Sequence, residues 1–145
     1  MTARSKGQAV VEFAFVAPFL VILTLSTMYA GILFMDYIQY SNAARSAARD
    51  ISLTDGFDKK RELVNDINAQ KETLLNRYAN QLTNLYNASW EAKLLKEDGK
   101  DATDESDASD VQISISLSIN NGPDLIILPD NLKTIVYKMT LERKS

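Results

Sequence analysis

Glu12 is the only charged residue between Lys6 and Asp36, in a stretch that is otherwise strongly apolar. A carboxylate in such surroundings costs a few kcal/mol when it enters a membrane, unless a cation pairs with it. A free α-amino group on a neighbouring chain would be such a cation. Alternatively, Glu12 lies at the inner membrane interface and reaches into the headgroups. The residues around Glu12 bear on which of these two interpretations holds.

The chain contains no histidine and no cysteine. Their absence excludes disulfides, thiol nucleophiles and imidazole acid–base catalysis. The sequence has no Gly-x-Ser-x-Gly motif and no glycine-rich phosphate loop. The formal net charge of −3 also argues against a nucleic-acid-binding protein. The composition therefore predicts no enzyme, no cofactor, no metal site and no nucleic-acid partner.

A long uncharged segment follows Glu12. Residues 13–35 would span about 35 Å as a helix, against about 30 Å for the hydrocarbon core of a bilayer. Arg4 and Lys6 precede the segment, and the positive-inside rule keeps that end in the cytoplasm. We expect a single-pass protein of the cell membrane, with residues 36–145 outside the cytoplasm. A cleaved signal peptide is a rival interpretation, but its apolar region is usually only about 7–15 residues long.

The residues around Glu12 resemble a known processing pattern. A short basic leader ends at Gly7, and Glu12 is the fifth residue after it. This is similar to the precursors of type IV pilin-like proteins, which a prepilin peptidase cuts after the glycine. Residues 4–52 also resemble the TadE-like family of the tight-adherence (Tad) pilus system, whose pattern is matched by Val11-Glu12-Phe13-Ala14, Pro18 and Asn42-Ala43-Ala44-Arg45, followed by Ala47, Ala48 and Arg49.

Two positions depart from the family's usual pattern. Phe13 stands where the major pilins of the system tend to have tyrosine, which favours a minor pilin or pseudopilin. Ala30-Gly31 stands where the family often has a Gly-Arg pair, which leaves the subfamily open.

The resemblance implies that residues 1–7 are a leader and that Gly7, Gln8 and Glu12 direct processing. Cleavage would remove Arg4 and Lys6, which lowers the formal charge from −3 to −5, and would free the α-amino group of Gln8. In pilin-like proteins this amino group pairs with the glutamate of an adjacent subunit, which cancels two charges in the membrane. The implied partners are a prepilin peptidase, other pilins or pseudopilins, and the inner-membrane Tad assembly platform.

Residues 8–53 are expected to form one helix. Pro18 removes a backbone hydrogen bond within it, either as a weak point useful in assembly or as a passive kink. Beyond the membrane, helical spacing places Tyr37, Tyr40, Ala44, Ala47, Ala48 and Ile51 on one face. This face could pack on another helix of the same chain or on another subunit.

Residues 54–96 are predicted to hold a second helix that packs antiparallel on the first. An apolar stripe at 3.5–3.6 spacing supports it, formed by Leu63, Ile67, Leu74, Tyr78, Leu82, Leu85 and Tyr86. A coiled-coil helix for another protein is the alternative. Trp90 is expected in the core or at the domain edge.

Residues 97–110 contain seven acidic side chains and one basic side chain, without a large apolar residue. A calcium loop is one interpretation, but the spacing does not match the Asp-x-Asp-x-Asp-Gly register. A solvated, mobile linker is favoured instead.

Residues 111–145 are predicted to be an antiparallel β region. Apolar and polar residues alternate strictly in 111–119 and again in 134–141, which is typical of strands buried on one side. Residues 125–128 could add a short strand between turns at 120–124 and 129–131. The fold class is therefore α+β, with a two- or three-stranded antiparallel sheet laid on the helices. The resemblance implies that this fold is type IV pilin-like.

The sequence as a whole predicts a minor pilin or pseudopilin of a Tad-like type IV pilus that supports pilus biogenesis and adhesion. Whether the chain enters the extracellular pilus stays open. The alternative is an uncleaved single-pass membrane protein with an extracytoplasmic binding or sensing domain. A released, secreted domain is a third possibility. The fate of residues 1–7 distinguishes the three.

Overall fold

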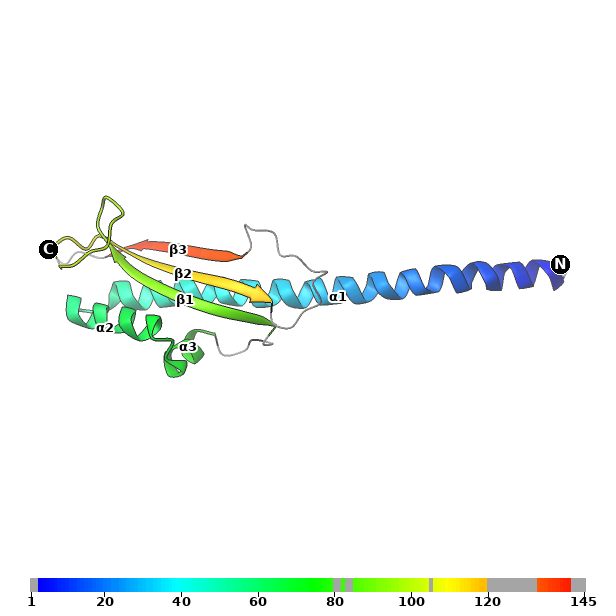
Figure 1. Cartoon of the computed structure of the whole chain (residues 1–145), viewed down its shortest axis with the longest axis horizontal. Helices are drawn as coiled ribbons and strands as arrows, with labels where there is room; N and C mark the ends of the chain where they lie inside the picture. Colours follow the sequence, from blue (N-terminus) through cyan, green and yellow to red (C-terminus); the bar gives the residue numbers. More distant parts are fainter. Residues whose placement is uncertain (1–2, 80–81, 83–84, 105, 120–132, 142–145) are drawn as a thin grey trace. The chain divides into compact units, whose positions relative to one another are not determined.

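The computed structural model describes residues 3–79, 82, 85–104, 106–119 and 133–141, with the backbone alone for residues 3–6. These residues form three helices and a three-stranded sheet (Figure 1). The chain divides into two compact units, Met1–Met35 and Asp36–Ser145. The long N-terminal helix and the antiparallel sheet confirm the predicted α+β class.

Helix α1 runs from Ala3 to Leu53 and belongs to both units. It continues through Pro18, although proline has no N–H to donate to the carbonyl one turn earlier. Within the second unit, the predicted face is largely confirmed. Its buried apolar residues are small, apart from one aromatic and one branched side chain: Tyr40, Ala43, Ala44, Ala47, Ala48 and Ile51. Asp36 and Ser52 are buried polar residues of the same part of α1.

Two short helices follow α1. Helix α2 is Phe57–Asn68 and helix α3 is Glu72–Tyr78. Gly56 has φ +87°, a left-handed conformation that suits glycine and separates α1 from α2. Gln70 has φ +54° and lies in the break between α2 and α3. Helix α2 buries Val64 and Ile67.

The sheet has the order β1-β2-β3, and both pairings are antiparallel. Its strands are β1 (Tyr86–Leu95), β2 (Asp110–Ile119) and β3 (Thr134–Thr140). In the register, Ile115 of β2 lies between Trp90 of β1 and Ile135 of β3. The alternation predicted for 111–119 and 134–141 is confirmed, since Val111, Ile113, Ile115, Leu117 and Ile135 are buried.

The inner face of the sheet packs on the part of α1 that lies in the second unit. The Tyr40 ring meets Tyr86 edge-on, with 6.2 Å between centroids, and lies 6.5 Å from Trp90. At the β3 edge of the same face, the Arg45 guanidinium lies over the Tyr137 ring, 5.5 Å from its centroid. Ser52 Oγ contacts Met139 Sδ at 3.6 Å. The core of this unit is therefore a helix-on-sheet layer.

The prediction of one helix through residues 54–96 was wrong. The helical part ends at Tyr78, and residues 86–95 are strand β1, with Trp90 in the core as an inward-facing strand residue. Pairing with the β1-facing edge of β2 outweighs the helix preference of Glu91-Ala92-Lys93-Leu94. Asp110, assigned to the linker, belongs to β2. The predicted turns at 120–124 and 129–131 and the strand at 125–128 lie outside the described residues.

Candidate functional site

The four site residues predicted from the sequence all lie on α1, in the first unit. They are Gly7, Gln8, Glu12 and Pro18. The helix runs without interruption across the Gly7–Gln8 peptide bond. A methyl group placed on Gly7 would have no heavy atom within 4 Å apart from its neighbours in the helix. Packing within the described part of the chain therefore gives no reason for glycine at position 7.

Gln8 and Glu12 lie one helical turn apart and are exposed. The Gln8 side-chain amide Nε2 donates a hydrogen bond of 3.3 Å to Glu12 Oε1. Among the described side chains, no cation forms an ion pair with Glu12. A neutral amide holds one carboxylate oxygen in place but leaves the negative charge uncompensated.

The residues after Glu12 present apolar side chains all round the helix. Phe13, Phe15 and Phe19 are exposed, and Phe19 is 77% accessible. By length and composition, α1 can cross a membrane within Gly7–Leu53. Burial of these rings in lipid is favourable, since each large apolar side chain gains roughly 1.5–3 kcal/mol on leaving water. The first part of α1 thus fits a membrane anchor, and it carries one carboxylate near its N-terminal end.

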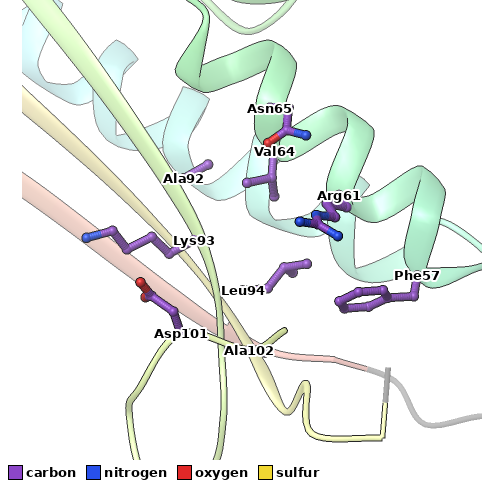
Figure 2. Close-up of a pocket in the computed structure, with 9 residues that line it drawn as sticks. All are labelled: Phe57, Arg61, Val64, Asn65, Ala92, Lys93, Leu94, Asp101 and Ala102. Carbon is purple, nitrogen blue, oxygen red and sulfur yellow. The ribbon is translucent and has the colours of Figure 1, made fainter. Parts of the chain in front are cut away.

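The second unit contains a groove that the sequence did not predict. It lies between α2 and β1 and has a volume of about 170 Å³. Figure 2 shows Phe57, Arg61 and Val64 projecting from α2 toward Ala92 and Leu94 of β1. The groove was missed because residues 86–95 were expected to be helical. The alternation of Trp90, Ala92 and Leu94 with charged residues is the sequence signal that could have revealed it.

The acidic segment connects β1 to β2 as an ordered loop in its described part. Lys96 pairs with Asp107 at 2.7 Å, and Lys100 pairs with Asp98 at 3.1 Å. Asp110, the first residue of β2, pairs with Lys138 at 2.7 Å, and this hydrogen bond lowers the pKa of the Asp110 carboxyl. Among the described residues, no group of three or more acidic side chains is arranged to hold a metal ion.

The fold and the site together fit one class of protein, namely an α+β domain with an apolar N-terminal helix long enough to cross a membrane. Comparison with known families is more specific. The family model for TadE-like protein matches residues 7–49. This confirms the resemblance inferred from the sequence and places Gly7, Glu12, Pro18 and the Ala-Arg run within the matched segment. No curated protein and no solved structure matches the chain. The long apolar helix and the family match fit a single-pass membrane protein associated with a Tad pilus.

Proposed function

We propose that this chain is a minor pilin or pseudopilin of a Tad-like type IV pilus. It is made as a precursor, and a prepilin peptidase removes residues 1–7. The mature α1 then assembles in the membrane with other pilins or pseudopilins on the inner-membrane Tad platform. The second unit projects out of the cytoplasm and supports pilus biogenesis and adhesion.

One observation carries the proposal. The family match begins at Gly7 and includes Glu12, and both residues lie on an exposed apolar helix. Gly7 has no packing contact beyond its own helix, and Glu12 has no cationic partner among the described side chains. A glycine without a packing role suits a position that a peptidase reads. A carboxylate without a cation suits a position that another subunit completes.

The geometry of Gln8 and Glu12 supports pairing between chains. The Gln8 side chain bonds Glu12 Oε1, so the carboxylate of each subunit is oriented before a partner arrives. Cleavage after Gly7 turns the backbone nitrogen of Gln8 into an ammonium group. When the ammonium of one subunit meets the carboxylate of the next, neither ion stays unpaired in lipid, which would cost a few kcal/mol each.

Pro18 lies six residues beyond Glu12 and leaves the carbonyl of Ala14 without its usual helical donor. This local weakness supports a role in assembly, because a helix that leaves a bilayer for a bundle must adjust its packing there. Pro18→Ala is expected to leave processing unchanged and to reduce assembly.

Substitution of Glu12 tests the proposed assembly. Glu12→Gln keeps the shape of the side chain and the contact with Gln8 but removes the charge. We expect the processed fraction of the variant to co-isolate at least about tenfold less with the other pilins of the system than the same amount of processed wild type, since lost pairing in lipid costs more than 1.4 kcal/mol.

Glu12→Asp is the matched control, because it retains the charge and should retain most of the co-isolation. Equal co-isolation of the wild type and Glu12→Gln would contradict pairing through Glu12. It would favour the alternative, an uncleaved membrane protein whose outer domain binds or senses a ligand, for which the groove between α2 and β1 is one candidate site.

A further inference from the structure

The two edges of the sheet differ in whether their outward backbone groups are hydrogen-bonded. The outer edge of β1 is closed by side chains and by a loop. Asn68 bonds both the N–H and the C=O of Ala92, at 2.7 and 2.9 Å, and Gln70 Nε2 donates to Trp90 O at 3.1 Å. Further along, Ala102 N donates to Leu94 O at 2.7 Å. Much of this edge therefore cannot accept another strand.

The outer edge of β3 is open. Leu117 N donates to Lys133 O and Leu141 N donates to Ser109 O, so the odd-numbered residues of this stretch bond β2. Their even-numbered neighbours then direct backbone N–H and C=O groups outward. These are Thr134, Val136, Lys138 and Thr140. Within the part of the chain that the structure describes, nothing bonds these backbone groups.

Side chains along β3 do not block this edge. Lysine often guards an exposed edge, but Lys138 is held by Asp110 on the neighbouring strand at 2.7 Å. Val136 is 57% exposed and lies on the outer face between Thr134 and Lys138, with Thr140 beyond Lys138. β-branched side chains favour strand pairing. The edge is thus suited to accept a strand along the length of β3.

Basic groups of α1 lie beside the same edge. Arg45 stacks on Tyr137 of β3, and Arg49 is one turn further along α1. Among the described residues, neither guanidinium has a carboxylate partner. A strand added to β3 would carry alternate side chains on the face toward these arginines, where acidic side chains are favourable.

A second copy of this chain paired antiparallel fits the edge poorly. Antiparallel pairing of β3 with β3 would bring the arginines of both copies to one seam. In this pairing the second chain would also run opposite to the first, because α1 and β3 run in the same direction. Arg45 lies against Tyr137, and Ser52, further along α1, lies against Met139, further along β3. Two chains anchored in one membrane cannot run in opposite directions. This step rests on the membrane anchoring of the proposed function.

We propose that the β3 edge binds an extended acidic segment of a partner protein by strand addition, with Arg45 and Arg49 selecting its acidic residues. The backbone of Thr134, Val136, Lys138 and Thr140 supplies the hydrogen bonds. The arginines supply the preference for negative charge. The partner class is a protein with an exposed acidic β-strand or tail on the outer side of the membrane.

Amide hydrogen exchange in the full chain, held in detergent micelles, tests this directly. The probes are two synthetic seven-residue peptides, Thr-Glu-Val-Glu-Val-Glu-Thr and the same sequence with lysine for glutamate. We expect the acidic peptide to slow exchange of the even-numbered β3 amides by at least about tenfold, and the basic peptide to have little effect. Equal protection by both peptides, or by neither, would overturn the proposal.

Two variants separate the edge from the charges. Val136→Pro removes one outward N–H and leaves the bonds to β2, so binding should weaken while the amides of Ile113 and Ile115 stay protected. Val136→Thr keeps the N–H and serves as its control. The double variant Arg45→Glu, Arg49→Glu should shift the preference to the basic peptide.

Protection of the even-numbered amides that rises with protein concentration in the absence of peptide would identify a second copy as the occupant and would refute the acidic partner. Failure here is distinguishable from failure of the proposed function, because the exchange measurement does not depend on cleavage after Gly7.

Discussion

The side chain of Asn68 forms two hydrogen bonds with the backbone of Ala92 at the edge of β1. An amide is the one side-chain group that can donate and accept as a peptide bond does. It therefore closes the edge at a point where another strand would otherwise bond. Both groups of Ala92 would lose their partners if this amide were removed.

We expect Asn68→Ala to lower the free energy of unfolding by about 1–3 kcal/mol, because a buried donor and acceptor are left without partners. Asn65→Ala is the matched control, since Asn65 is an exposed residue of the same helix. Thermal unfolding of both variants, followed by circular dichroism, measures the difference. Equal stability of the two variants would contradict a role for Asn68 at this edge.

Tyr78 joins α3 to α1, because its hydroxyl donates to Asp50 Oδ2 at 3.1 Å. Burial, and next the Asp50 carboxylate, raise the pKa of Tyr78 to about 12 from 10.0. The protonated phenol is favoured in the folded state. The stability that it contributes is therefore complete below pH 10 and is lost as the pH rises from 10 to about 12.

Tyr78→Phe removes this titration. We expect the melting temperature of the variant to fall less steeply than that of the wild type between pH 10 and 12. Some alkaline loss should remain, because burial and the nearby Asp36 carboxylate also raise the pKa of Tyr40. Identical slopes for the two proteins would show that the Tyr78–Asp50 bond does not contribute in solution.

At the scale of elements, the second half of α1 depends on small side chains. Ala43, Ala44, Ala47 and Ala48 are at most 1% exposed, and the sheet covers them. Because alanine has no side chain beyond Cβ, helix and sheet can approach closely here. Protein interiors are packed tightly enough that added methyl groups force neighbours to move.

Ala47→Leu is therefore expected to lower the free energy of unfolding by about 1–3 kcal/mol through overpacking. Ser46→Leu adds the same side chain at the adjacent exposed position and should change stability by no more than about 0.5 kcal/mol. Urea or thermal unfolding of the full chain in detergent distinguishes them. A tolerated Ala47→Leu would mean that the helix and the sheet are loosely packed.

Much of this element arrangement was predictable from the sequence. The buried face of α1 follows from the spacing of Tyr40, Ala44, Ala47 and Ile51, and strands β2 and β3 follow from strict alternation. Strand β1 was missed because Leu82, Leu85 and Tyr86 continue a helical stripe and Glu91–Leu94 favour helix. The alternation of Tyr86, Ala88, Trp90, Ala92 and Leu94 was present but weak, since two of these residues are alanine.

The candidate site was predictable in a different way. Gly7, Gln8, Glu12 and Pro18 were singled out because residues 4–52 resemble the pattern of the TadE-like family, and their roles stay predictions. All four lie on one helix, so no long-range contact is needed to bring them together. The open edge of β3 could not be predicted in this way. The side chains of Asn68 and Gln70 bond the edge of β1 and leave that of β3 open. Which edge they bond depends on where α2 ends beside the sheet.

At the scale of the whole molecule, the two parts of α1 suit different surroundings. Its first part exposes phenylalanines that suit lipid, and its second part buries alanines under a sheet. Glu12 lies near the start of the lipid-facing part. The central claim is that cleavage after Gly7 turns this anchor into a subunit by creating a cation for Glu12.

The most direct test is the intact mass and N-terminal sequence of the protein purified from its native membranes. The proposed function predicts a chain that begins at Gln8, with or without N-methylation, and lacks Arg4 and Lys6. A chain that begins at Met1 would contradict processing and leave a permanent anchor, whereas a chain that lacks the apolar segment would identify a secreted domain.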